Sequence, residues 1–129
     1  MKPRDLERKV KKLYEDQSWL VDQAFYNVKH LPGGKIIANK VDFAHVFDLI
    51  CYKQDNPILL IQVCLDTTAK AHFRKIDEQF GMHTCTYFRV MVVGVVVTKK
   101  GTRNTYSYKV YERYPEKWIA IGQLGKINI

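Results

Sequence analysis

The stretch "FDLICYKQDNPILLIQVC", residues 47–64, constrains the fold of this chain more than any other segment. It contains two strongly apolar runs of strand length, joined by the turn-prone segment "KQDNP". This pattern predicts a β-hairpin whose strands lie in a buried sheet. The hairpin also contains an acid, Asp48, and an amide, Gln62, at places where an apolar core needs neither. Both residues therefore require a structural or a chemical explanation.

The segments on either side of the hairpin each predict an amphipathic helix. Residues 3–16 carry apolar side chains at helical spacing behind Pro3, which a first helical turn tolerates. Residues 67–80 repeat this spacing behind a threonine cap and end before Gly81. On the first helix Glu7 lies at the margin of the apolar face. Its carboxylate can face a neighbouring cleft there, although a solvated flank is the usual position of such a residue.

The remaining segments predict strands and turns. "SWLVDQAFYNV" is typical of one strand, and "KHLPGGK" of a turn whose glycines permit positive φ. "KIIANKV" is compatible with a short strand or an irregular arm. "TYFRVMVVGVVVT" is the longest apolar strand, and it is followed by "NTYSYKVYERY", with aromatic residues at alternate positions, and by the short "KWIAIG". The predicted order is therefore helix, three strands, helix, strands.

Length and apolar content fit one domain. A chain of 129 residues, of which 47% are hydrophobic, can bury one core and has no room for a second. Its longest apolar runs are far shorter than the roughly 20 residues of a membrane span. The charged start "MKPRDLERKVKK" has no apolar core after it, unlike an export signal. We expect a soluble, cytoplasmic protein with no membrane partner.

The cysteines point to the same compartment. An odd number of them lie in apolar strand-like segments without CxxC pairing, which predicts buried thiols in a reducing environment. They are Cys51, Cys64 and Cys85. The alternative is a zinc site that also uses His45, His72 or His83. That site would have to converge from unrelated spacings, whereas structural zinc usually binds ligands in tight sequence pairs.

The formal charge of +8 is concentrated in two segments. Residues 1–12 and residues 99–117 each contain six basic and two acidic residues, and together they account for the whole excess. Because Lys and Arg gain affinity by releasing counterions from phosphates, this distribution predicts a polyanionic partner. On charge alone, a basic surface that only maintains solubility is the alternative.

A helix with an acid, a hairpin carrying "FDLI", a strand carrying "IQVC" and a following helix with basic residues form one arrangement. It resembles the PD-(D/E)XK, or restriction-endonuclease-like, nuclease superfamily, which includes archaeal Holliday-junction resolvases and many small phage and archaeal-virus nucleases. The resemblance covers residues 3–98 and leaves 99–129 as a C-terminal β extension. It implies a single-domain α/β (α+β) fold, with a mixed central β-sheet flanked by helices.

The resemblance also implies roles for particular residues. In that superfamily the hairpin acid and the first position of the (D/E)xK triplet bind a metal, and the triplet lysine helps to activate water. By position, Asp48 corresponds to the hairpin acid, Gln62 to the first triplet position and Cys64 to the lysine. Glu7 matches the helix acid that many members add to the site.

Two of these positions depart from the superfamily pattern. The amide of Gln62 can bind a hard cation but brings no negative charge, so affinity for Mg²⁺ should be low. The thiol of Cys64 brings no positive charge, and Lys70 or Lys75 in the next helix would have to act as a displaced lysine. The site is therefore expected to be either weakly active or inactive.

A working site would hydrolyse DNA phosphodiesters with one bound Mg²⁺ or Mn²⁺. The implied cation ligands are Asp48, Gln62, the carbonyl of Val63 and Glu7. Phosphates of duplex or branched DNA would be held by basic side chains, without sequence readout. The candidates are Arg4, Arg8, Lys12, Lys35 and Lys40.

Three functions remain open on the sequence. The first is a metal-dependent endonuclease, for which a homodimer is expected because a symmetric dimer cuts both strands most easily. The second is a catalytically inactive DNA-binding protein of the same fold. The third is a protein-interaction domain in which the edge "YSYKVYERY" pairs with a partner strand. A purely structural reading also stands, in which Asp48 caps a turn and Gln62 satisfies a sheet edge.

Overall fold

The computed structural model describes residues 3–43, 46–80 and 87–124, with the side chains of residues 3, 25–29 and 37–41 not described. Within these ranges the elements, in chain order, are α1 (Pro3–Asp16), β1 (Leu20–Gln23), β2 (Phe25–His30), β3 (Ile36–Val41), β4 (Leu49–Tyr52), β5 (Ile58–Leu65), the 3₁₀ turn η1 (Asp66–Thr68), α2 (Ala69–Gln79), β6 (Phe88–Lys100), β7 (Arg103–Arg113) and β8 (Trp118–Leu124). No helix in this part of the chain is both long and apolar enough to span a membrane.

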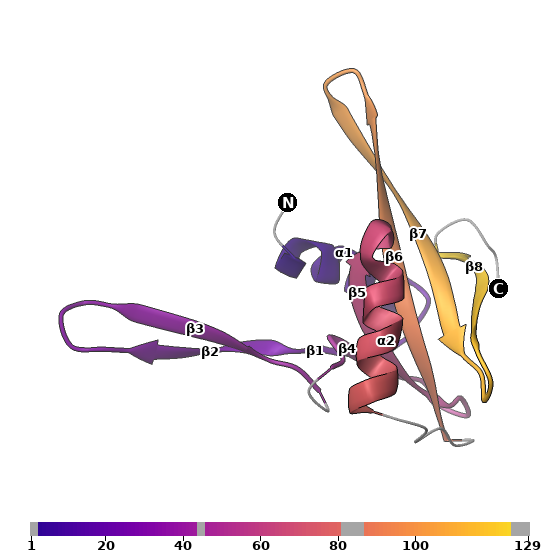
Figure 1. Cartoon of the computed structure of the whole chain (residues 1–129), viewed down its shortest axis with the longest axis horizontal. Coiled ribbons are helices and arrows are strands. Elements are labelled where there is room, and N and C mark those ends of the chain that lie inside the picture. The colour runs from indigo at the N-terminus through magenta and orange to yellow at the C-terminus, as the bar shows by residue number, and fades with distance from the viewer. Residues whose placement is uncertain (1–2, 44–45, 81–86, 125–129) are drawn as a thin grey trace.

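One mixed sheet organises the molecule. Its six strands run in the order β1-β4-β5-β6-β7-β8. β5 and β6 are parallel and α2 connects them, while the other neighbouring strands are antiparallel. The two helices pack on opposite faces of this sheet (Figure 1). The chain is therefore a single α+β domain with a mixed central sheet, as predicted.

Each helix covers its own core. Leu6, Val10 and Tyr14 of α1 pack on the sheet face that carries Ile61 and Val63. The opposite face carries Cys64 and packs against Ala69 and Ile76 of α2, with Phe73 half-buried beside them. Both helices begin and end within a few residues of the predicted bounds, because the spacing of these apolar side chains sets where a helix can pack.

The segment expected to form one strand forms two. It breaks at Ala24, whose N–H donates to the Asp48 carbonyl at 2.7 Å. β1 pairs with β4 in the main sheet, whereas β2 pairs with β3 in a separate two-stranded ribbon. The prediction of a single strand was wrong because apolar alternation does not record where a chain leaves a sheet. The segment left open as strand or arm is strand β3, and Gly33 and Gly34 take φ values of +86° and +78° at the ribbon tip.

The C-terminal strands belong to the core sheet and are not an appendage. The boundary expected at residue 98 falls inside β6, and β7 pairs directly with β6 from Arg103 to Glu112. β7 also pairs with β8 from Tyr108 to Arg113, so this part of the tyrosine-rich strand is interior. The proposal that this strand offers a free edge to a partner was therefore wrong for these residues.

A glycine in β6 allows the chain to turn after β5. A Cβ atom at Gly94 would lie 2.4 Å from Oδ1 and 3.1 Å from Cα of Asp66, the first residue of η1. Asp66 Oδ1 accepts a hydrogen bond from the Tyr111 hydroxyl at 2.7 Å, and Oδ2 lies 3.6 Å from Lys109 Nζ. The turn into α2 is therefore held against β6 and β7, so close that residue 94 has no room for a side chain.

Gly94→Ala should lower the free energy of unfolding by about 1–3 kcal/mol, because the added methyl group overpacks a fixed backbone turn. Urea unfolding of this variant measures the loss. In an Asp66→Ala background the carboxylate contact is absent, so the same substitution should cost less. Equal costs in the two backgrounds would show that the Asp66 side chain does not restrict this position.

Candidate functional site

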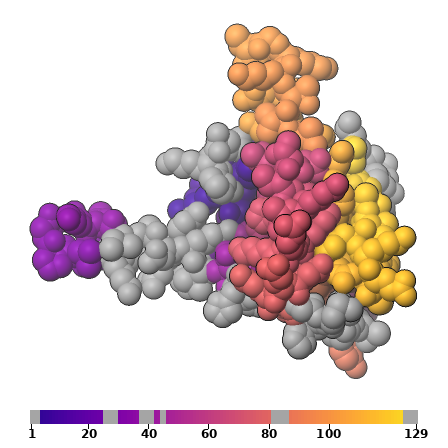
Figure 2. All heavy atoms as spheres, viewed as in Figure 1, coloured from indigo at the N-terminus to yellow at the C-terminus, as the bar shows by residue number. Residues whose placement is uncertain are grey.

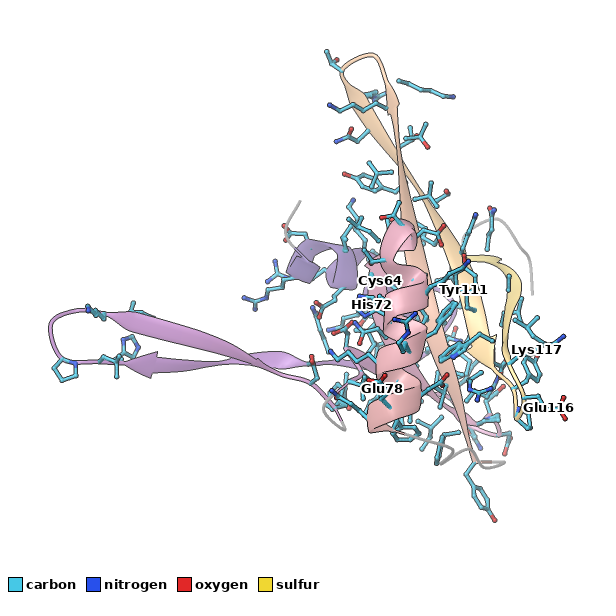
Figure 3. All side chains as sticks on the ribbon, in the orientation of Figure 1. Cys64, His72, Glu78, Tyr111, Glu116 and Lys117 are labelled. Atoms are coloured by element: carbon cyan, nitrogen blue, oxygen red, sulfur yellow. The ribbon has the colours of Figure 1, made fainter. Side chains whose placement is uncertain are left out.

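A cavity of about 490 Å³ lies at the carboxyl end of β5. α1, η1, α2 and the base of the β6–β7 ribbon contribute to its walls (Figure 3). Its polar lining residues are Glu7, Gln62, Thr68, His72, Asn104 and Tyr106. Cys64 lines the same space. The candidate residues from α1 and β5 are thus brought to one place.

The cavity exists because β4 is shorter than β5. β4 pairs with β5 only from Leu59 to Ile61, and the Asp48 N–H donates to the Ile61 carbonyl at 2.8 Å where this pairing ends. Beyond that point β5 continues without β4 beside it. The Asp48 carboxylate takes the place of a strand, because its Oδ2 accepts the Val63 N–H at 2.7 Å. Asp48 is only 1% exposed, so this bond forms away from bulk water.

Gln62 meets Asp48 at the same oxygen. Its Nε2 donates to Asp48 Oδ2 at 2.9 Å and lies 3.3 Å from the Val63 carbonyl oxygen. The opposite orientation of the amide would bring its oxygen against the carboxylate, with two acceptors facing each other. Gln62 Oε1 is buried and has no hydrogen-bond partner within the described residues. It can accept a further donor.

These contacts do not fit a bound divalent cation. The expected ligands do meet: the Asp48 carboxylate, the Gln62 amide and the Val63 carbonyl lie within hydrogen-bond distance of one another. A hard cation needs oxygens turned toward it, however, and here an N–H group lies between two of the oxygens. Among the described residues no group of three or more His, Cys, Asp or Glu side chains is arranged to hold a metal ion.

Glu7 and Cys64 lie on either side of this contact. Glu7 is 2% exposed on the inner side of α1 and lines the cavity, away from open water. Burial raises the pKa of the Cys64 thiol to about 11, with the Thr68 hydroxyl acting in the opposite direction. Cys64 is therefore a neutral thiol near pH 7 and supplies no positive charge to the site.

The lysines proposed as substitutes lie elsewhere on α2. Lys70 is exposed and Lys75 is half-buried, and the described lining of the cavity includes neither. The α2 residue that does reach the cavity is His72 (Figure 3). Sequence reasoning considered His72 only as a zinc ligand. Its position one helical turn after Thr68, which also lines the cavity, was the available signal.

Cys51 and Cys64 cannot share the zinc ion that the sequence left open. Cys51 and Cys64 are both buried and free, and they belong to cores on opposite faces of the sheet. One metal ion cannot bind both, since the sheet lies between them. Three other residues considered for the site, His45, His83 and Cys85, lie outside the described residues.

The predicted phosphate-binding residues fall on two elements. Arg4, Arg8 and Lys12 are exposed on α1, where Arg8 lies 3.9 Å from Asp5 and Lys12 lies 2.7 Å from Asp16. Lys35 is exposed at the tip of the β2–β3 ribbon. The side chain of Lys40 lies outside the described set. Two of the α1 cations are thus partly neutralised by neighbouring acids.

A part-buried ion pair between β6 and β7 was not anticipated from the sequence. Glu112 of β7 is 7% exposed and receives two hydrogen bonds from Arg89 of β6, at 2.7 and 2.5 Å. This pair lies on the sheet face of α1, and Arg89 lines a separate hollow beside Tyr14 and Trp19. The bidentate geometry satisfies both charges, which explains how an acid is accommodated inside the sheet.

Comparison of the chain with protein-family models, curated proteins and solved structures found no match.

Removal of the Asp48 carboxylate should destabilise the fold. Asp48→Ala leaves the buried Val63 N–H without its acceptor and should lower the free energy of unfolding by about 2–4 kcal/mol. Asp48→Asn keeps one oxygen and should cost less. Urea unfolding at pH 7 measures both, with Glu116→Ala, an exposed acid in the β7–β8 turn, as the control for loss of one negative charge. A cost for Asp48→Ala no larger than the control would contradict the bridging role.

Proposed function

We propose that this protein binds duplex or branched DNA on a restriction-endonuclease-like scaffold, and that its hydrolytic site is closed by Gln62. The observation that carries the proposal is the meeting of Asp48, Gln62 and the Val63 carbonyl beside one cavity, which Gln62 and Val63 line. These are the groups that the family resemblance assigns to cation binding, and they lie together at the open end of the β4–β5 hairpin, Asp48 directly before β4 and the other two in β5.

The connectivity supports the scaffold. α1 is followed by β1, β4 and β5 as an antiparallel series, and α2 then crosses over to β6, which is parallel to β5. The β2–β3 ribbon is an insertion between β1 and β4. Without that insertion, the order is the helix, three strands, helix and strand that the resemblance requires.

The charge distribution supports a nucleic-acid partner. The formal charge of the chain is +8, and the two segments that carry it lie on α1 and on β6–β7. The exposed cations of both segments lie outside the cavity, where they would contact phosphates and position a duplex. Binding of this kind requires no metal.

The chemistry of the cavity argues against hydrolysis by the chain as it stands. Asp48 Oδ2 already accepts two N–H groups, Gln62 presents its nitrogen to that oxygen, and Cys64 carries no charge near pH 7. A cation would have to turn the Gln62 amide and displace one donor. DNA binding without cleavage is therefore the activity that these residues support best.

DNA binding should be independent of metal and steeply dependent on salt. Fluorescence anisotropy with a labelled duplex should give the same Kd with EDTA and with Mg²⁺. Arg8→Glu with Lys12→Glu should weaken binding and reduce the slope of log K against log salt by about 2. Arg74→Glu with Lys117→Glu makes the same change in charge on α2 and the β7–β8 turn, and should have a smaller effect. Absence of DNA binding at low salt would refute the proposed function.

Restoring the acid should convert the site into a cation site. Gln62→Glu places a second carboxylate against Asp48 Oδ2, so the variant should unfold at a lower temperature than the wild type. Mn²⁺ should then raise its melting temperature, because a cation relieves the repulsion, whereas the wild type should not respond. Adding Asp48→Asn should remove the response to Mn²⁺. A wild type stabilised by Mn²⁺ as strongly as the variant would show that the amide does not close the site.

A further inference from the structure

The far end of the β6–β7 hairpin leaves the sheet as a two-stranded ribbon. β5 covers β6 only as far as Val95, and β8 covers β7 only from Tyr108 onward. Val96–Lys100 and Arg103–Ser107 therefore pair only with each other. Every residue from 97 to 105 is exposed, and Figures 1 and 2 show this ribbon standing clear of the body of the protein.

The ribbon is basic and contains no acid. The sequence from residue 79 to residue 111 has no Asp or Glu, and three cations lie at the ribbon tip: Lys99, Lys100 and Arg103. No ion pair is formed by these three within the described residues, whereas Arg8 and Lys12 of α1 face Asp5 and Asp16. The tip is thus a strongly positive protrusion.

Cross-strand partners assign these side chains to two faces. Lys100 lies opposite Arg103 and shares its face with Thr98 and Thr105. Lys99 lies opposite Asn104 on the other face, which continues toward the cavity. Both faces carry hydrogen-bond donors, and residues 98–105 include no large apolar side chain; Val97, 44% exposed, lies further from the tip on the face of Lys99. A protein-binding strand would need apolar anchors at the tip.

The base of the ribbon is anchored. Tyr106 packs against the α1 core and lines the cavity, and Lys9 of α1 lies 4.8 Å above its ring. At the tip Gly101 takes a φ of +65°, which closes a two-residue turn between Lys100 and Arg103. The ribbon is therefore a fixed extension of two core strands.

We propose that the β6–β7 ribbon inserts into the major groove of duplex DNA, with Lys100 and Arg103 leading. The inference rests on the proposed function. A two-stranded ribbon is one of the two elements that this groove admits, and the groove is about 8.5 Å deep. Five residues on each strand extend about 17 Å, enough to reach the base edges from the body of the protein. The tip cations contact phosphates on entry, and Arg103 carries a side chain suited to a guanine edge.

The test compares two charge reversals in the full-length chain by fluorescence anisotropy on one duplex. Lys100→Glu with Arg103→Glu should weaken binding by at least about tenfold and reduce the salt slope by about 2. Arg74→Glu with Lys117→Glu changes the charge equally on α2 and on the β7–β8 turn, where Figure 3 labels Lys117 away from the ribbon, and should weaken binding much less. Both variants alter exposed side chains, and circular dichroism checks that they fold.

A second duplex tests the groove itself. DNA whose major groove is filled by glucosylated 5-hydroxymethylcytosine should bind the wild type weakly, and a duplex preloaded with a minor-groove ligand should bind normally. If the wild type binds DNA and the ribbon variant binds equally well, or if the filled groove has no effect, the ribbon is not the inserting element. If the wild type binds no DNA, the proposed function fails together with this inference. Capture of an acidic protein by the ribbon in place of DNA would likewise overturn it.

Discussion

The bond between the Asp48 carboxylate and the Val63 N–H is the constraint on which the site depends. β4 begins at Leu49, opposite Ile61, so the edge of β5 beyond Ile61 has no strand to accept its donors. An unmet N–H in this buried place would cost about 1–3 kcal/mol, and a carboxylate oxygen meets it at 2.7 Å. The same oxygen accepts the Gln62 amide, which gives the buried charge a second donor. The acid and the amide in the hairpin are therefore explained together, as one buried unit.

This unit has the converging oxygens of a cation site, but an N–H group takes the place of the cation. Two oxygens, from Asp48 and from the Val63 carbonyl, converge on the Gln62 nitrogen, which carries partial positive charge. An amide can stabilise such a pair of acceptors without an ion, and it does so through geometry that the chain supplies itself. Under the proposed function, the scaffold keeps the shape of a hydrolytic site, and exposed cations outside the cavity position the DNA.

Two ribbons give the molecule its outline, and they have different origins. β6 and β7 continue past the neighbours that bury them, whereas β2 and β3 pair only with each other as a separate two-stranded sheet, so both ribbons depend on turn geometry and cross-strand pairs. Glycines with positive φ close both tips. Such protrusions bury little apolar surface, and a polar, basic surface on one of them is consistent with contact to a charged partner.

The sequence by itself determined the helices, the hairpin and the buried strands, because apolar spacing fixes which faces can be buried. The resemblance to a nuclease superfamily implied that Asp48, Gln62, Glu7 and Cys64 would gather; Glu7, Gln62 and Cys64 line one cavity, and Gln62 donates to Asp48. The sequence did not indicate that residues 18–28 divide between two sheets, that β7 is interior, or that His72 reaches the cavity in place of Lys70 and Lys75. Those features depend on where each strand ends relative to its neighbours. Only the tertiary structure decides this, because strand length is set by long-range pairing and the direction of a side chain by what packs against it.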